Sequence, residues 1–191
     1  MILPAEFESR MRAQLGNEFD QFANALRRES PVSVRLNHQK LQTTLPLKPV
    51  AWCNSAYYLD QRPVFSSDPL WHNGSYYVQE ASSMMVEAAF LKAKSILNRP
   101  LKVLDLCAAP GGKSTLLANL MGEEDVLVAN EVIRTRVPVL FENLCKNGYP
   151  NTIITNVDSA DFEKVGAIFD IVLVDAPCSG CLLYTSDAAD E

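Results

Sequence analysis

The order of apolar segments after residue 100 limits the possible fold more than any other feature of the chain. Apolar runs that predict strands alternate with amphipathic segments that predict helices. The strands are expected at 101–106, 125–130, 152–156 and 169–174, and the helices at about 113–121, 133–147 and 159–165. Strands that alternate with helices form an open parallel sheet. We therefore expect an α/β fold with a Rossmann-like sheet, truncated after about four strands because none is predicted after Gly180.

The first hundred residues follow a different pattern. Residues 4–29 predict two short helices, which end at Ser30 because the residue before a proline avoids the helical region. The other elements expected are strands at 32–36, 51–53, 56–59 and 75–79, within a loop-rich stretch over 41–73, and a helix over 80–94. We predict a small α+β N-terminal domain (1–73), the Rossmann-like domain (74–180) and a tail (181–191).

The composition restricts the partners and the compartment. A net charge of −6 and a pI near 5.0 argue against nucleic-acid binding by bulk charge alone, although a local basic face stays open. Basic residues gather in the first forty positions, either as solvated helix faces or as phosphate contacts: Arg10, Arg12, Arg27, Arg28, Arg35 and Lys40. The chain begins without a signal-peptide pattern, and no apolar run reaches the ~20 residues of a membrane helix. Five scattered cysteines indicate a reducing cytoplasm.

The loop after the first predicted strand of the sheet suits a nucleotide-like cofactor. Asp105 ends that strand, Gly111 and Gly112 follow, and a helix begins near Lys113. Glycines let the backbone approach a ligand, and a helix N-terminus supplies free N–H groups. The loop is not a P-loop, because Cys107 stands where the first glycine is required, and the chain contains no G-x-G-x-x-G. A plain glycine turn is the alternative.

Acidic residues follow three successive strands of the predicted sheet. They are Asp105, Glu131 and Asp158. An acid after the second strand is where such folds hold ribose hydroxyls. Each acid taken alone also fits a helix N-cap or a surface position.

A cysteine follows the last predicted strand. That strand ends at Asp175, and Cys178 lies three residues further on, which suggests thiol-dependent group transfer with Cys178 as the nucleophile. We expect no metal site, since Cys178 and Cys181 have no second cysteine pair and His38 and His72 lack ligand spacing.

These segments resemble the RNA (cytosine-5)-methyltransferases that use S-adenosylmethionine, the NOL1/NOP2/Sun family. The resemblance rests on Leu104 to Lys113, Glu131 with Arg134, Asp158 and Asp175 to Gly180. Residues 74–84 are similar to the segment that precedes the cofactor domain. Val34 to Asn37, Lys40, Trp52 and Cys53 resemble the N-terminal domain of the RsmB/RsmF-like branch, which acts on small-subunit ribosomal RNA.

The resemblance implies a role for each matched residue. The cofactor's methionine end is wrapped by Cys107, Ala108, Ala109, Pro110, Gly111, Gly112 and Lys113. Glu131 takes the ribose, Asp158 lies by the adenine, and Asp175 lies between the cofactor and the target base. Arg35, Asn37 and Lys40 are expected to bind RNA.

The resemblance also changes the expected role of Cys178. In the family the nucleophile lies in a Thr-Cys motif after the next strand, and the Pro-Cys cysteine, here Cys178, assists product release. This chain contains no Thr-Cys, and residues 181–191 do not resemble the family, so we expect a non-native tail and an inactive fragment. The alternatives are a cofactor-binding module without catalysis and a nucleotide triphosphatase, which Cys107 disfavours.

Overall fold

The computed structural model describes residues 3–176, and its contacts divide the chain into two units, Met1–Pro31 and Val32–Glu191. The first unit contains α1 (Ala5–Leu15), a 3₁₀ turn (Gly16–Glu18) and α2 (Phe19–Arg27). Phe22 of α2 contacts Phe7 of α1, with ring centroids 6.3 Å apart. The two short helices predicted over 4–29 are confirmed.

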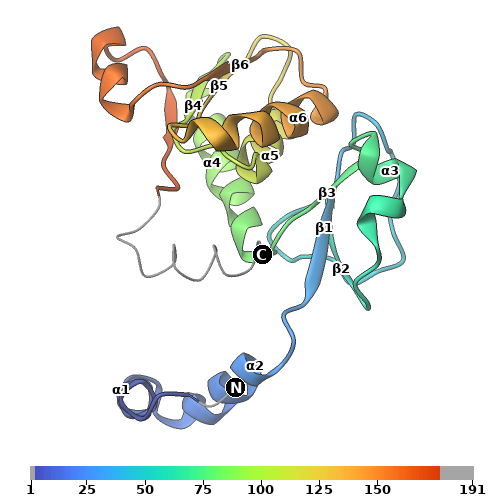
Figure 1. Ribbon diagram of the computed structural model, residues 1–191, viewed down its shortest axis with the longest axis vertical. Helices are drawn as coiled ribbons and strands as arrows, with labels where there is room; N and C mark the ends of the chain where they lie inside the picture. The colour runs from blue at the N-terminus through green and yellow to red at the C-terminus, as the bar shows by residue number, and fades with distance from the viewer. Residues whose placement is uncertain (1–2, 177–191) are drawn as a thin grey trace. The chain divides into compact units, whose positions relative to one another are not determined.

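The second unit begins with a small antiparallel sheet. Its central strand β1 (Val32–Leu36) pairs with β2 (Ala56–Leu59) on one side and β3 (Tyr76–Val78) on the other (Figure 1). The loop between β2 and β3 contains a 3₁₀ turn (Phe65–Ser67) and α3 (Pro69–His72). The boundary predicted after residue 73 separates β3 from β1, although the two strands pair; the domain division stays a prediction.

The strand predicted at 51–53 is wrong. Ala51 and Trp52 form a turn in which the N–H of Cys53 donates to the carbonyl of Val50 (3.2 Å). Val50 and Cys53 are both buried, and the indole of Trp52 donates to the carbonyl of Ala81 (2.6 Å). A turn therefore packs these apolar residues into the core. A short apolar run in the sequence does not show whether it forms such a turn or a strand.

The rest of the second unit is built on a four-stranded parallel sheet. The strands are β4 (Lys102–Asp105), β5 (Val126–Asn130), β6 (Thr152–Thr155) and β7 (Ile171–Leu173), in the order β6-β5-β4-β7. The α/β class and the Rossmann-like sheet are confirmed. The chain runs outward from β4 to β6 and then returns to β7 beside β4. The carboxyl ends of β4 and β7 therefore form a topological switch point, where open α/β sheets bind ligands.

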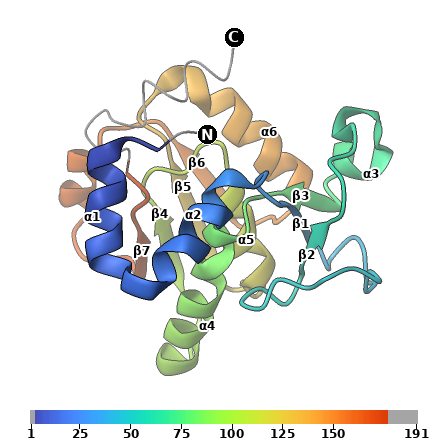
Figure 2. The ribbon, with the colours of Figure 1, turned by 90° about the horizontal axis from the view of Figure 1, so that it is seen from below.

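Helices link and cover these strands. A 3₁₀ turn (Ser82–Met85) leads into α4 (Val86–Leu97), which precedes β4. The later helices are α5 (Gly112–Leu120), a 3₁₀ turn (Arg134–Arg136) with α6 (Val137–Asn147), and a 3₁₀ helix (Ser159–Val165). Helix α5 contacts both α4 and α6 (Figure 1 and Figure 2). No helix within residues 3–176 is long and apolar enough to cross a membrane.

The core lies between the parallel sheet and these helices. Val103, Leu127 and Ala129 of the sheet are fully buried, as is Leu140 of α6. Helix α5 buries five consecutive residues, Ser114 to Ala118, because it is enclosed by the sheet and by its neighbouring helices. A helix enclosed in this way fixes the position of the loop that leads into it.

Gly74, just before β3, approaches the C-terminal end of α6 more closely than any other residue type could. Its φ is +74°, and a Cβ atom there would lie 2.0 Å from the carbonyl oxygen of Lys146. The side chain of Asn37 donates to the carbonyls of Gly74 (3.2 Å) and Asn147 (2.9 Å). Lys40 Nζ donates to the carbonyls of Asn73 (2.7 Å) and Lys146 (2.5 Å).

We predict that Gly74→Ala lowers the free energy of unfolding by at least about 2 kcal/mol more than Gly148→Ala, measured by urea denaturation. Both glycines have positive φ, which strains alanine by roughly 1–2 kcal/mol. The added Cβ at Gly148 would make only an ordinary contact, 3.4 Å from Lys40 Cε. Equal losses in the two variants would show that residues 73–74 can move away from α6 without penalty.

Candidate functional site

A cavity of about 230 Å³ opens at the carboxyl ends of β4 and β7. One wall is the loop after β4, the other is the segment from β3 to the turn before α4, and Asp175 follows β7. The lining residues are Tyr77, Val78, Gln79, Glu80, Ser83, Cys107, Ala108, Ala109, Pro110, Gly112, Lys113 and Asp175. The cavity thus occupies the switch point of the sheet, where a ligand is expected.

The loop wall contains most of the residues that the sequence assigns to the cofactor. Of Cys107 to Lys113, every residue except Gly111 lines the cavity. Gly111 has φ +110° and precedes the first residue of α5, and a Cβ atom there would face Leu140 and Asn143 of α6. Gly111 therefore forms the turn, whereas Gly112 borders the space.

The opposite wall was not assigned any role from the sequence. Tyr77 and Gln79 approach Gly112 so closely that a Cβ at Gly112 would lie 3.4 Å and 3.3 Å from their side chains. The available signal was the similarity of residues 74–84 to the segment that precedes the family's cofactor domain. The structure adds that this segment reaches the cavity through the pairing of β3 with β1.

Asp105 lies buried at the end of β4. Its Oδ2 accepts a hydrogen bond from Ser114 Oγ (2.6 Å), and its Oδ1 is buried without a partner among residues 3–176. Burial raises the pKa of Asp105 to about 6, while the hydrogen bond from Ser114 and the charge of Lys113 act in the opposite direction. Asp105 is 1% exposed and does not itself line the cavity, so its carboxylate lies behind the lining residues.

Two oppositely charged side chains meet at the edge of the cavity. Lys113 Nζ forms an ion pair with Asp175, whose side chain is 57% exposed. Cys107 lies close by, and burial followed by the charge of Glu131 raises the pKa of its thiol. Cys107 is therefore a neutral wall residue near pH 7 and no thiolate nucleophile.

Glu131 and Asp158 do not line the cavity. The buried carboxylate of Glu131 accepts the N–H groups of Ala109 (3.2 Å) and Ile133 (2.8 Å). Asp158 caps the following 3₁₀ helix by accepting the N–H of Ala160 (2.9 Å). Glu131 thus attaches the end of β5 to the loop after β4. The contacts of Glu131 to ribose and of Asp158 to adenine stay predictions.

The three residues expected to bind RNA have intramolecular partners instead. Arg35 is 2% exposed, and each of its guanidinium nitrogens donates a hydrogen bond within the protein. Asn37 is also 2% exposed, and Lys40 donates to two carbonyls near the end of α6. This placement corrects the expectation for Arg35, because a buried guanidinium is not presented to an RNA phosphate.

Some predicted features cannot be placed. Cys178, Cys181 and the tail lie outside the described residues. Within residues 3–176, no three His, Cys, Asp or Glu side chains gather closely enough to hold a metal ion.

Solved structures define the class of protein first. A methyltransferase homolog from Pyrococcus horikoshii is 30% identical, with a TM-score of 0.69 over 86% of this chain and 56% of that one. NSun6 from the same organism, solved with SFG, is 16% identical with a TM-score of 0.70 over 92% of this chain and 71% of that one. The latter shows the fold alone. The second unit is thus built on a methyltransferase-type Rossmann-like fold.

The family follows from sequence matches. Residues 3–81 match the N-terminal domain of 16S rRNA methyltransferase RsmF, and residues 96–188 match 16S rRNA methyltransferase RsmB/F. Ribosomal RNA small subunit methyltransferase F of Salmonella arizonae is 35% identical over 198 residues, covering 94% of this chain and 40% of the relative. The chain belongs to the RsmB/F family and spans about 40% of the length of such relatives. The match includes residues 181–188, and a non-native tail stays a prediction.

We predict that Asp105→Asn becomes more stable relative to the unmodified chain as pH rises from about 4 to 7. The pKa of Asp105 is about 6 in the folded chain, against an ordinary value of 3.8. Between these values the folded state holds a proton that the unfolded state has released, so ionisation of Asp105 lowers stability as pH rises. About two pKa units correspond to at most ~3 kcal/mol.

Urea denaturation at several pH values measures this difference. Asparagine keeps an oxygen that can accept the hydrogen bond of Ser114, so a constant offset is compatible with the prediction. A difference between the two chains that does not change with pH would contradict the raised pKa.

Proposed function

We propose that this chain is the cofactor-binding part of an S-adenosylmethionine-dependent RNA (cytosine-5)-methyltransferase that acts on small-subunit ribosomal RNA in the cytoplasm. The observation that carries the proposal is the cavity at the switch point, walled by Cys107 to Lys113 and bordered by Asp175. Membership of the RsmB/F family and the relative's name support the RNA substrate. Activity, substrate and partner of the whole protein are part of this proposal.

The side chains around the cavity fit the amino-acid end of S-adenosylmethionine. That end carries an ammonium and a carboxylate group. The N-terminus of α5 with Lys113 offers positive charge to the carboxylate, and the carboxylate of Asp105, behind the lining residues, attracts the ammonium. Glu131 lies behind the loop, where it can accept the ribose hydroxyls beside its two backbone donors. When bound, the cofactor supplies an electrophilic sulfonium methyl group.

Methylation at C5 of cytosine requires activation of a weakly nucleophilic carbon. A thiolate that adds to C6 supplies this activation, and we assign to Asp175 the role of the acid that stabilises the adduct through N3. Cys178 is three residues from Asp175 and keeps its proposed catalytic role in product release. The target base must be single-stranded or flipped out to enter the site.

A second candidate function is cofactor binding without catalysis. It rests on the cavity alone and requires no nucleophile. Both candidates require the cavity to bind S-adenosylmethionine, and they differ in methyl transfer.

We predict that the chain binds S-adenosylmethionine in calorimetry and that Glu131→Gln weakens binding about tenfold or more. A hydrogen bond to a charged group contributes roughly 1.5–3 kcal/mol, and the amide would set an N–H against the backbone N–H of Ala109 or Ile133. Glu124→Gln is the control, because Glu124 is an exposed turn residue before β5, at the opposite end of that strand. Equal affinity in all three chains would refute the ribose assignment.

We also predict that this chain transfers no methyl group above background to unmodified small-subunit RNA. The sequence lacks the Thr-Cys motif to which the family assigns the attacking thiolate. Incubation with tritiated cofactor followed by counting of precipitated RNA measures the transfer. Incorporation that disappears in Cys178→Ala would identify Cys178 as the nucleophile and contradict the product-release role.

A further inference from the structure

We propose that Arg35 is a positioning residue for the cofactor cavity: from β1 it holds the first turn of α5 and the side chain of Gln79, one on each wall. This proposal rests on the proposed function, because it concerns the same cavity. It replaces the RNA contact that the sequence suggests for Arg35 with a role in cofactor binding.

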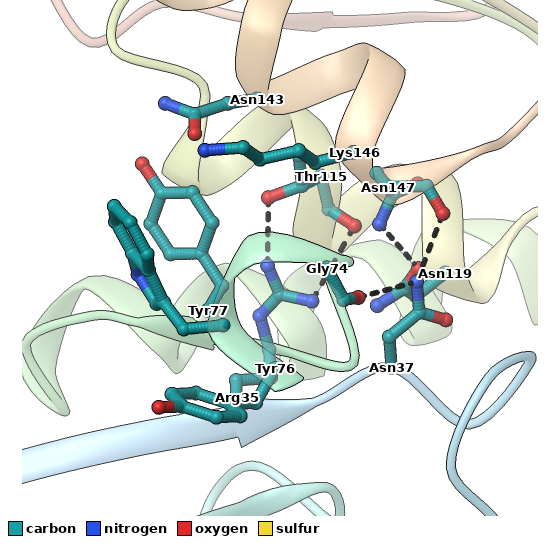
Figure 3. A pocket seen from close by; sticks show the side chains of 11 residues that line it. Arg35, Asn37, Gly74, Tyr76, Tyr77, Thr115, Asn119, Asn143, Lys146 and Asn147 are labelled. Atoms are coloured by element: carbon teal, nitrogen blue, oxygen red, sulfur yellow. Dashed lines mark hydrogen bonds between the residues drawn. The ribbon is translucent and has the colours of Figure 1, made fainter. Parts of the chain in front are cut away.

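The contacts of Arg35 join the two walls. Its Nε donates to Gln79 Oε1 (3.1 Å) on the β3 side. Its Nη1 donates to the carbonyl of Thr115 (3.4 Å), and its Nη2 to the carbonyl of Gly112 (3.3 Å) and to Thr115 Oγ1 (2.8 Å). Figure 3 shows the guanidinium of Arg35 directed at Thr115. Gln79 and Gly112 both line the cavity, so one planar group sets the distance between them.

The hydroxyl of Thr115 extends this contact to the glycine turn. Thr115 Oγ1 accepts from Arg35 and donates to the carbonyl of Gly111 (2.8 Å). Gly111 has the positive φ that turns the loop into α5. Arg35 therefore restrains the end of the loop that is expected to wrap the cofactor.

Because Arg35 is buried, its N–H groups require hydrogen-bond acceptors at fixed positions. Burial lowers the pKa of Arg35 to about 10, so the group stays charged at neutral pH. A buried charge must have its hydrogen-bonding capacity met. The partners here are carbonyl, hydroxyl and amide oxygens, and a lysine ammonium cannot reproduce a planar fork that reaches both walls.

Helix α5 offers a matched control at its other end. Lys94 Nζ of α4 donates to the carbonyl of Leu120 (3.0 Å) and forms an ion pair with Asp125 (2.8 Å). Lys94 and Arg35 are thus both cations that hold a carbonyl of the same helix. Only Arg35 contacts residues of the cavity.

The first experiment uses hydrogen exchange without cofactor on the chain and on Arg35→Met, Arg35→Lys and Lys94→Met. We expect backbone amides at 107–116 to exchange about tenfold faster in Arg35→Met, with a smaller effect in Arg35→Lys. Lys94→Met should affect only amides near the end of α5. Unchanged exchange at 107–116 in both Arg35 variants would overturn the proposal. If the methionine variant proves too unstable to measure, unchanged exchange in Arg35→Lys alone would overturn it.

The second experiment measures S-adenosylmethionine affinity by calorimetry at a temperature where every variant is folded. We expect a loss of about tenfold or more in Arg35→Met, a partial recovery in Arg35→Lys, and no change in Lys94→Met despite its lower Tm. Equal affinities in the Arg35 and Lys94 variants would reduce Arg35 to general stabilisation. If the unmodified chain fails to bind, the proposed function fails, and the exchange experiment still decides the positioning of the loop.

Discussion

The arrangement of the second unit depends on the hydrogen bonds that the buried guanidinium of Arg35 donates. A guanidinium without water must be satisfied by acceptors held at fixed positions. Those acceptors come from Gln79, which follows β3, and from the first turn of α5. The buried Asn37 and the exposed Lys40 donate in addition to carbonyls at the end of α6. Polar groups of residues 35–40 thus contact both α5 and α6. These contacts hold the antiparallel sheet against the parallel sheet, so that the cavity beside residues 107–113 has a second wall.

The parallel sheet could be predicted because its signal is local. Strands of a parallel sheet give continuous apolar runs, and each run here is followed by an acid or a glycine-containing turn, although only β4 and β5 are largely buried. The same rule failed at 51–53, where a turn buries Val50 and Cys53. Its partners lie far along the chain, since Trp52 donates to Ala81 and Cys53 to Glu87. The helix predicted at 159–165 is 3₁₀, a distinction that side-chain periodicity over seven residues does not resolve.

The site could be predicted on one side only. Residues 107–113 are recognisable because glycines and a strand-to-helix turn are required wherever backbone approaches a ligand. The opposite wall depends on the pairing of β1 with β3, in which Leu36 pairs with Tyr76 and Val34 with Val78, far apart in the sequence. Arg35 was expected to bind RNA because of the matched motif and the basic residues of the first forty positions. In the structure β1 is the central strand and its last four residues are buried, so the guanidinium donates to α5.

The acids at the strand ends show why residue type alone does not assign a role. Asp105 is buried with a raised pKa and one unpaired oxygen, Glu131 is buried but accepts two backbone N–H groups, and Asp158 caps a turn. Asp105 keeps one oxygen without a partner within residues 3–176, whereas each oxygen of Glu131 accepts a backbone N–H. Asp175 differs again, since its exposed carboxylate is paired with Lys113. In the proposed function the carboxylate of the cofactor competes with Asp175 for Lys113, and an Asp175 released from Lys113 is then available to the target base.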